Sequence, residues 1–415
     1  MQIAILSHLF PVQSETFVRG HVLGMAGRGH RVHVVARELG GEGPWTGGDT
    51  PPDPVRVSYT GLPSFRGSGL VNHVRMILRH GPWVLPFSRR APWPPRRMLE
   101  AVRYHAAALE DGPDVVHVHF GDLGARMAYL GRYLGVTFPD VVTWHGYDAT
   151  ALSSLRGSGM FRELFLSDCL HTVGSAFMGQ RLLELGARPE ATRVIPMGID
   201  LECFEGPWER DPRMGSLQIL SVGRLVEVKG HRYLLEAVGR LAAAGRRVEV
   251  CLVGDGPLRG ALKTQAADLG IADRVTFTGG LDQDRVIEMM RSADVFALTG
   301  VVEASGRAEG QGLVYAEAQA MGLPVIASDV GGVRDSLVDG ETGFLCPQRD
   351  AEAIAVRIAH FDDHREEIPR FGARGRAFVT SRFSREGMLD AFQGLYDRVV
   401  EARRAGMPLV PEKGA

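Results

Sequence analysis

The sequence predicts an α/β protein in which two doubly wound parallel sheets form two Rossmann-like domains. Both halves of the 415-residue chain alternate short apolar runs with helical patterns, which is typical of parallel sheets covered by helices. A hydrophobic content of 45% is enough for two cores, one in each domain of roughly 200 residues. Between the halves, residues 205–212 are polar and rich in turn-forming residues. We therefore place the linker there.

The apolar runs predict the strands in chain order. In the first domain, residues 1–206, we expect strands at 3–7, 31–36, 115–119, 141–143, 169–173 and 193–196. In the second domain, residues 213–383, we expect strands at 218–222, 248–253, 275–278, 295–298 and 324–327. A last helix is predicted over residues 384–405.

Charge and cysteine content restrict the class of protein. The net charge of −2 implies no general attraction to nucleic acid. The four cysteines, Cys169, Cys203, Cys251 and Cys346, lie far apart without metal-ligand spacing, so we expect buried thiols in a reducing cytoplasm. The first residues run straight into a strand, and no apolar run reaches membrane-spanning length. These features predict a cytoplasmic enzyme without a signal peptide or membrane span.

Residues 309–344 carry the most informative pattern, because Glu309 and Glu317 lie on either side of an expected helix start. Gly310 and Gly312 let the backbone approach a ligand closely, and the helical pattern begins at Leu313. The N-terminus of a helix favours an anion such as a diphosphate. Glu317, about one turn into the helix, would accept both hydroxyls of a ribose, and Glu309 would lie nearer a sugar. An ordinary βα unit with two solvated glutamates is the alternative.

The same stretch resembles the signature of the retaining glycosyltransferases of family 4. Glu309 and Glu317 match its E-x7-E spacing, and EAQAMGLPVIASDVGG at 317–332 matches the segment that follows. Gln311 stands where the family often has Phe, and Asp335 where Glu is usual. The resemblance implies the GT-B fold, whose two domains face a cleft and whose C-terminal helix crosses back to the first domain. It also implies that Glu309 contacts the donor sugar and Glu317 the ribose.

Two cations follow the first strand of the second domain. Arg224 and Lys229 are five positions apart in a loop, where a guanidinium fork and a compact ammonium group could hold a pyrophosphate. The chain has only three lysines, Lys229, Lys263 and Lys413, so a lysine at 229 is unusual. A surface charge is the alternative. Family 4 members place their diphosphate-binding Arg and Lys in this R-x4-K pattern.

Two further loops of the second half match the family more weakly. Gly254 and Asp255 form a glycine-rich turn after a strand, which an ordinary βα loop explains equally well. The family places the equivalent loop near the nucleotide. Thr278 and Gly279 resemble the stretch that contacts the base through its backbone.

In the first half, His145 follows an apolar strand and resembles the histidine of the family's H-G-x-D segment. That resemblance implies a contact to the donor sugar, whereas a structural histidine is the alternative. His117 and His119 share one face of a buried strand, but the sequence indicates no further ligand nearby, so we interpret them as structural. Asp282 and Asp284 imitate a metal motif at an expected helix start, where acids cap the helix. We therefore expect neither a metal nor a cofactor.

The segment FPVQSETF at 10–17 resembles an exopolysaccharide subgroup of the family, of the colanic-acid type. Ser14 or Thr16 would cap a helix that faces an acceptor or a phosphate, although capping alone explains both residues. Residues 54–99 contain eight arginines, no Asp or Glu, and the aromatic residues Trp83, Phe87 and Trp93. They predict peripheral association with an anionic membrane surface, with the tryptophan at the interface, and a lipid-linked acceptor. A solvated arginine-rich face is the alternative.

These patterns predict a metal-independent retaining glycosyltransferase that moves a sugar from a nucleoside diphosphate to a hydroxyl of a saccharide acceptor. The sugar-orienting residues would be His145 and Glu309, and the leaving diphosphate would meet Arg224 and Lys229. Transfer to a small natural product, a phosphorylase or epimerase on the same architecture, and a non-catalytic nucleotide-sugar-binding subunit are the alternatives.

Overall fold

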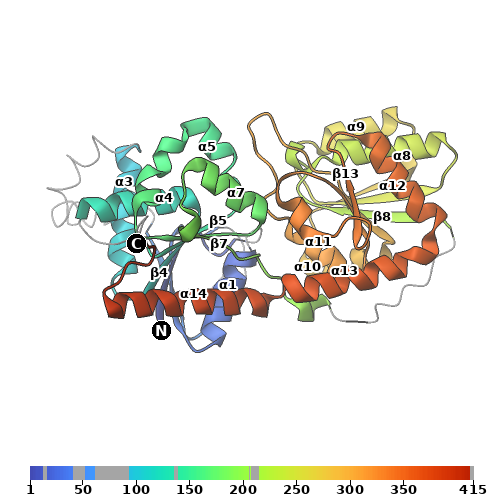
Figure 1. Ribbon diagram of the computed structural model, residues 1–415. Helices are drawn as coiled ribbons and strands as arrows, with labels where there is room; N and C mark the ends of the chain where they lie inside the picture. Colours follow the sequence, from blue (N-terminus) through green and yellow to red (C-terminus); the bar gives the residue numbers. More distant parts are fainter. Residues whose placement is uncertain are drawn as a thin grey trace. The chain divides into compact units, whose positions relative to one another are not determined.

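The computed structural model describes residues 1–12, 16–40, 52–60, 93–134, 139–204, 206 and 215–411. They form two compact units. Unit 1 consists of Met1–Val173, Gly179–Ile195 and Leu389–Ala415, and unit 2 of Gly174–Met178 and Pro196–Met388. Each unit contains a parallel sheet with helices on both faces (Figure 1). The predicted fold class, two Rossmann-like domains, is therefore confirmed.

The sheet of unit 1 has seven strands in the order β3-β2-β1-β4-β5-β6-β7. Their bounds are β1 Gln2–Leu9, β2 Arg31–Glu38, β3 Val55–Tyr59, β4 Val115–His119, β5 Val141–Trp144, β6 Leu170–Val173 and β7 Thr192–Val194. All pairings between these strands are parallel. The central strands are buried on both faces, as expected for a sheet covered by helices.

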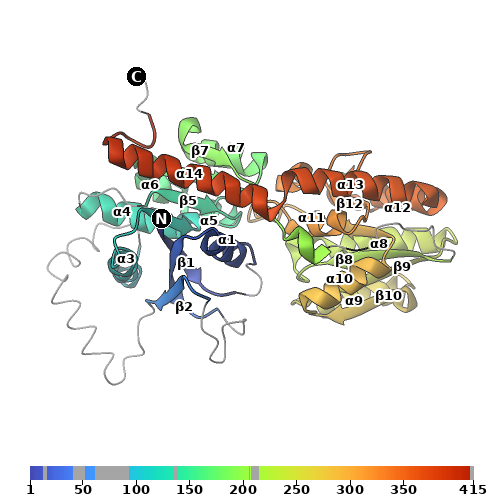
Figure 2. The same cartoon turned by 90° about the horizontal axis from the view of Figure 1, so that it is seen from below.

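Helices cover both faces of this sheet. Their bounds are α1 Thr16–Gly27, α3 Pro95–Ala108, α4 Gly121–Leu134, α5 Ala151–Arg156, α6 Arg162–Leu166, α7 Ala176–Leu185 and α14 Arg385–Ala405. Helices α3 and α4 pack together on one face, and α1 lies with α14 on the other (Figures 1 and 2). The close approach of α14 to α1 depends on Gly24, where a Cβ atom would lie 2.3 Å from Leu389 Cδ1.

The C-terminal helix crosses back to the first unit, as predicted. Residues Arg385–Met388 of α14 belong to unit 2, whereas its remainder belongs to unit 1. Near its end, Arg403 Nη2 lies 2.7 and 2.9 Å from the two carboxylate oxygens of the buried Asp140. This pairing fixes the last turns of α14 to unit 1, because removal of Arg403 would leave the buried Asp140 carboxylate without its cation.

The sheet of unit 2 has six strands in the order β10-β9-β8-β11-β12-β13. Its strands are β8 Leu217–Val222, β9 Val248–Val253, β10 Val275–Gly279, β11 Val295–Leu298, β12 Val325–Ser328 and β13 Gly343–Cys346. Its helices are α8 His231–Ala243, α9 Arg259–Asp268, α10 Gln283–Ser292, α11 Leu313–Ala320, α12 Ala351–Asp363 and α13 Ile368–Arg382. Helices α8, α9 and α12 enclose one apolar core, and α10, α11 and α13 another on the opposite face (Figure 1).

Three details differ from expectation. Strands β3 and β13 lie at sheet edges and were not predicted, and only one of the five residues of β3 is fully buried. Cys169 and Cys346 are buried as predicted, but Cys203 is exposed and Cys251 half-buried. In the short helix that contains Cys203, the neighbouring Phe204 fills the core instead.

Within the described residues, none of the helices is long and apolar enough to cross a membrane.

Candidate functional site

The predicted site residues of unit 2 gather at one edge of its sheet. Parallel neighbours end at the same edge, and β10, β9, β8 and β11 are consecutive in the sheet. The loops at that edge carry Arg224 and Lys229 after β8, Gly254 and Asp255 after β9, Thr278 and Gly279 at the end of β10, and Glu309, Gly310, Gly312 and Leu313 after β11. Loops at four consecutive strand ends thus carry the predicted residues of unit 2, except Glu317, which lies within α11.

The centre of this edge is an ion pair between Lys229 and Glu309. The Lys229 ammonium group donates a hydrogen bond to Glu309 Oε2, and the two side chains are 19% and 20% exposed. Burial raises the pKa of Glu309, but the charges of Lys229, Arg307 and Arg224 outweigh burial and lower the pKa below its usual value. Glu309 is therefore a carboxylate at neutral pH, held close to several cations.

The exposed Arg224 completes the cationic side of the edge. Its charge contributes to the lowered pKa of Glu309, so the guanidinium lies close enough to act on the same anion. Lys229 is the last residue of a short helical turn, Glu227–Lys229, which follows Arg224 in the chain. Gly230 closes that turn at φ +64°, where a Cβ atom would lie 1.8 Å from the Thr299 carbonyl oxygen. Only glycine permits this close approach, which sets the direction of Lys229.

A glycine pair shapes the loop that carries Glu309. The Gly332 amide donates to the Glu309 carbonyl over 2.9 Å, and a Cβ atom on Gly332 would lie 1.9 Å from the Gly310 carbonyl oxygen. The Ser175 hydroxyl also donates to that Gly310 oxygen, over 2.6 Å. The glycine pair at 331–332 therefore packs directly beneath the Glu309–Gly310 backbone.

Helix α11 begins directly after this loop. Gly312 precedes it in the left-handed region at φ +80°, and the Tyr315 amide donates to the Gly312 carbonyl over 3.1 Å. The first N–H groups of a helix have no intrahelical acceptor, so Leu313 and Val314 can offer theirs to an anion. Glu317 follows one turn later and is half-buried, and burial raises its pKa to about 7. In the described residues its carboxylate has no hydrogen bond or ion pair.

Both departures from the family pattern have structural roles. Gln311 is buried and clamps the backbone of Met197: its Oε1 accepts from the Met197 amide over 2.8 Å, and its Nε2 donates to the carbonyl over 2.9 Å. Asp335 accepts from the Ala176 amide over 2.6 Å, at the first residue of α7. Both residues hold loops of unit 2 in place.

The loops after β8, β9 and β10 interlock through glycine. Gly254 lies at φ +135°, donates to the Gly279 carbonyl over 2.8 Å, and would place a Cβ atom 2.1 Å from the Gly223 carbonyl oxygen. The Asp255 carbonyl accepts from the Leu225 amide over 2.9 Å, while its carboxylate is largely exposed. The Thr278 hydroxyl donates to the Gly279 carbonyl over 2.8 Å. At this part of the site the Arg259 guanidinium lies over the loops: it is 3.4 Å from the Asp255 carboxylate, and a Cβ atom on Gly279 would lie 3.8 Å from its Nη1.

His145 lies in unit 1, directly after β5, and is half-buried. The neighbouring Asp148 anchors its loop by accepting hydrogen bonds from the amides of Gly121, His145, Gly146 and Ala149 at 2.7 to 3.2 Å. Burial lowers the pKa of His145 to about 3, followed in effect by the charge of His21. His145 is therefore neutral at physiological pH and offers one donor and one acceptor nitrogen.

The interpretation of His117 and His119 as lacking a further ligand nearby was wrong. His21, from α1, joins them, and ligand nitrogens of the three buried side chains lie within 4.8 Å of one another. Helix α1 is distant in sequence from β4, so no spacing in the chain signals this meeting. The second metal-like motif behaves as predicted: Asp282 caps α10 by accepting from the Arg285 amide over 2.9 Å.

The structure describes only some of the residues that were predicted to lie on the acceptor side. Ser14 lies outside the described residues, and Thr16 is the exposed first residue of α1 rather than the residue before it. Of the arginine-rich segment, residues 61–92 lie outside the described residues, Arg96 is exposed, and Arg97 pairs with Glu100 over 2.9 Å. The expectation that Trp93 lies at a membrane interface was wrong: it is 5% exposed and packs edge-on against Tyr129.

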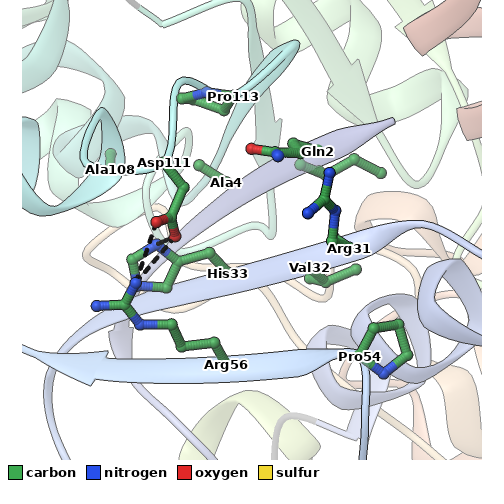
Figure 3. Close-up of a pocket in the computed structure, with 11 residues that line it drawn as sticks. Gln2, Ala4, Arg31, Val32, His33, Pro54, Arg56, Ala108, Asp111 and Pro113 are labelled. Atoms are coloured by element: carbon green, nitrogen blue, oxygen red, sulfur yellow. Dashed lines mark hydrogen bonds and ion pairs between the residues drawn. The ribbon is translucent and has the colours of Figure 1, made fainter.

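A pocket of about 340 Å³ lies in unit 1 at the amino-terminal edge of its sheet, opposite the edge that carries His145 (Figure 3). Its lining includes Gln2, Arg31 and Pro54, at the amino-terminal ends of β1, β2 and β3. Asp111 lies 3.0 Å from Arg56 and 3.5 Å from His33 there (Figure 3), and burial, followed by the charge of Arg56, lowers the pKa of His33. None of the predicted site residues lines this pocket, and ligands in such sheets bind at the carboxyl edge. We do not assign it to the site.

Comparison with known proteins covers both units. Residues 14–203 match the family model described as Glycosyltransferase Family 4, and residues 207–378 match the one described as Glycosyl transferases group 1. The putative colanic acid biosynthesis glycosyltransferase WcaL of Salmonella typhimurium is 28% identical over 94% of this chain and 97% of its own length. The amylovoran biosynthesis glycosyltransferase AmsK of Erwinia amylovora is 30% identical over 65% of this chain and 67% of its own.

Solved structures share the fold. The Anabaena protein HepE, in complex with UDP and glucose, matches with a TM-score of 0.69 and 17% identity over 96% of this chain and 99% of its own. Sucrose-phosphate synthase from Thermosynechococcus elongatus matches with a TM-score of 0.71 and 22% identity over 97% of this chain and all of its own. Together with the motifs and the two parallel-sheet units, these matches show that the chain belongs to the family 4 glycosyltransferases and resembles their exopolysaccharide-synthesising members.

Proposed function

We propose that this glycosyltransferase is a retaining enzyme that takes a sugar from a nucleoside diphosphate and adds it to a hydroxyl of a growing saccharide. The observation that carries the proposal is the Lys229–Glu309 ion pair beside Arg224, at the edge where four strand ends meet. Cations and a carboxylate with no other described role in the fold suit a substrate that carries both phosphate and hydroxyl groups.

The diphosphate fits the cationic side of this edge. Arg224 would bind two phosphate oxygens with its planar guanidinium fork, and Lys229 would reach the leaving oxygen as a point charge. The amides of Leu313 and Val314 add the positive end of the α11 dipole. These groups stabilise negative charge that grows on the diphosphate as the glycosidic bond breaks, which lowers the barrier.

The two glutamates fit the hydroxyl groups of the donor. Glu317 is half-buried and unpaired among the described residues, so its carboxylate can accept from both hydroxyls of a ribose. Glu309 is oriented by Lys229, which suits a residue that holds the transferred sugar and does not attack it. We therefore assign no protein nucleophile. Retention follows the family resemblance, with the donor phosphate accepting the acceptor proton.

No step of this proposal requires a metal, because cations and a helix N-terminus stand where a metal would neutralise the diphosphate. The similarity to WcaL and AmsK, whose names refer to colanic acid and amylovoran biosynthesis, supports a saccharide acceptor. A lipid-linked acceptor at an anionic membrane surface remains a part of the proposal that rests on the arginine-rich segment 54–99.

The test begins with the nucleotide. Thermal unfolding of the full chain with UDP, GDP or ADP should identify one base, because a ligand at a hundred times its Kd adds about 2.7 kcal/mol. The corresponding nucleotide sugars are then incubated with saccharide acceptors, and the anomeric configuration of the product is determined by NMR. A retained configuration supports the proposal. An inverted product contradicts retention, and nucleotide binding without any turnover would indicate a binding subunit.

A further inference from the structure

His145 is the end of a continuous chain of hydrogen bonds that runs through the interior of unit 1. The chain uses both ring nitrogens of three further histidines and connects β5, β4, α1, α14 and β6. From His145 to Tyr396 the links are His145 Nε2 to His119 Nδ1 at 2.9 Å, His119 Nε2 to His21 Nδ1 at 3.2 Å, and His21 Nε2 to Tyr396 Oη at 2.9 Å. From Tyr396 onward they are Tyr396 Oη to His117 Nδ1 at 2.5 Å, His117 Nε2 to Thr143 Oγ1 at 2.6 Å, and Thr143 Oγ1 to Thr172 Oγ1 at 2.5 Å.

All members beyond His145 are buried, with at most 1% of their surface exposed. Burial lowers the pKa of His21 to about 3 and the pKa values of His117 and His119 well below the usual range. Each imidazole is thus neutral and carries one proton, so one of its nitrogens donates and the other accepts. The seven groups of the chain therefore carry seven protons for six links, so one proton is left over at one end.

The proton count fixes the direction of the chain. A reversal at Tyr396 would leave its buried hydroxyl proton without an acceptor, which is costly. All links must therefore run the same way. If they ran from His145 toward Thr172, the buried Thr172 hydroxyl would end the chain with a proton that has no acceptor among the described residues. If they run from Thr172 toward His145, every buried proton has an acceptor. The second direction is favoured.

In this direction His119 donates to Nε2 of His145, and the single proton of His145 resides on Nδ1. We propose that His119, His21 and Tyr396 are positioning residues that hold His145 in its Nδ1–H tautomer, so that Nδ1 presents a hydrogen-bond donor to an oxygen of the bound donor sugar. This inference rests on the proposed function in one respect, the identity of the ligand that His145 meets. The tautomer itself follows from the chain alone.

A metal site is the competing explanation for the same cluster, because His21, His117 and His119 bring three nitrogens together. The contacts favour the hydrogen-bonded chain. Each of the six ring nitrogens already pairs with a protein partner, and the links include no carboxylate that would offset a cation's charge. Metal analysis of the purified protein nevertheless decides between the two.

The test reads the tautomer directly. Full-length protein with 15N-labelled histidine is examined by NMR, in which the ring nitrogens of His145 distinguish the two tautomers. Wild type should give the Nδ1–H form. His119→Leu removes the proton offered to Nε2 and should convert His145 largely to Nε2–H or to a mixture. Tyr396→Phe removes the hydroxyl that joins His21 to His117. The remaining links to His145 then have no imposed direction, so His145 should be a mixture of its two tautomers.

Tyr104→Phe is the matched control, because it also removes a buried tyrosine hydroxyl from unit 1. That hydroxyl donates to the Ser7 carbonyl over 2.7 Å and lies outside the chain. This variant should leave the His145 signals unchanged. If the two variants in the chain also leave them unchanged while they remain folded, the positioning role is wrong. One equivalent of bound zinc in wild type, lost in His119→Leu, would replace the chain by a metal site.

Activity separates this inference from the proposed function. With an identified donor, Tyr396→Phe should lower kcat in proportion to the fraction of His145 that leaves the Nδ1–H form, about twofold for an equal mixture, and should change KM less. An altered tautomer in a protein that transfers no sugar would support the chain and contradict the proposed function. Normal transfer by Tyr396→Phe with an altered tautomer would show that His145 does not use Nδ1 on the sugar.

Discussion

The ammonium group of Lys229 pairs with the carboxylate of Glu309, 80 residues further along the chain. Neither side chain is fully buried, and the pair lies where the ends of β8 and β11 meet. A pair of this kind adds little to stability when partly exposed. Its arrangement is better explained by a ligand that needs a cation and a hydrogen-bond acceptor side by side.

The two cations should be required for transfer. We expect Arg224→Ala and Lys229→Ala each to lose about 1.5–3 kcal/mol of transition-state stabilisation, or roughly ten- to hundredfold in kcat/KM, because charge-assisted hydrogen bonds to the diphosphate disappear. Lys263→Ala is the control, since this exposed lysine of α9 contacts only the ring of Phe277 at 5.8 Å among the interactions described. Normal kinetics in both test variants would disprove the phosphate clamp.

Donor binding should depend on pH through Glu317. Burial raises its pKa to about 7, so the carboxylate that accepts the ribose hydroxyls forms only as pH rises through that value. Donor affinity, measured by calorimetry, should therefore increase from pH 6 to pH 8. Glu317→Gln should bind more weakly with no such dependence and should keep kcat nearly unchanged, because a ribose contact is equal in ground and transition states. A turnover defect at unchanged affinity would contradict this role.

The raised pKa of Glu317 also predicts how the stability of the fold depends on pH, and stability should change in the opposite direction to donor affinity. A carboxyl group whose folded pKa lies above its unfolded value stabilises the fold below the unfolded pKa, near 4.5, and this contribution is lost as pH rises through about 7. Glu317→Gln should accordingly increase the free energy of unfolding at pH 8.5, by at most about 3 kcal/mol, and have little effect at pH 4.5. Denaturant titrations at the two pH values measure the difference. Equal effects at both would mean that the group is not shifted.

Activity should survive chelation. We expect dialysis against EDTA to leave kcat within about twofold, because Arg224, Lys229 and the N-terminus of α11 neutralise the diphosphate in the proposed mechanism. The measurement is the initial rate of transfer before and after dialysis, with and without added magnesium or manganese. Complete loss that either ion restores would overturn the metal-free mechanism.

The glycine beneath Glu309 should tolerate no side chain. Gly332→Ala places a Cβ atom 1.9 Å from the Gly310 carbonyl oxygen, so the loop that carries Glu309 must move. We expect a loss of roughly 1–3 kcal/mol in unfolding free energy, as in other overpacked sites, together with weaker donor binding. Gly260→Ala is the control, because no atom lies within 4 Å of the added methyl group on α9. Wild-type stability and binding in Gly332→Ala would show that this backbone contact is unimportant.

Membrane association remains a prediction of the arginine-rich segment, now without a contribution from the buried Trp93. The protein should sediment with anionic but not neutral vesicles, and salt should weaken binding. Each arginine near the surface contributes about 1 kcal/mol. The test variant changes Arg89, Arg90, Arg96 and Arg97 to Ser. The control, of equal charge, changes the exposed Arg285, Arg370, Arg374 and Arg382 to Ser. No binding to anionic vesicles, with efficient transfer to a free acceptor, would favour a small soluble acceptor.

The sequence by itself determined the fold class and most strands, because buried parallel strands appear as short apolar runs that local composition reveals. It also placed Arg224 and Lys229 after a predicted strand and Glu309 and Glu317 around a predicted helix start, which the structure brings to one edge because parallel strands end together. The edge strands β3 and β13 escaped prediction; in β3 apolar and polar residues alternate and only one residue is fully buried, so no continuous apolar run marks it.

Only the tertiary structure decided which of these groups touch. Lys229 and Glu309 meet because β8 and β11 are neighbours in the sheet. In the sequence, β9 and β10 lie between these two strands, and no spacing in the chain records the order of strands in the sheet. The buried histidine chain depends on α1 and α14, whose contributions His21 and Tyr396 lie 375 residues apart in sequence. Local patterns report the period of a strand or helix, whereas contacts between distant segments follow from packing, which shape and burial decide across the whole fold.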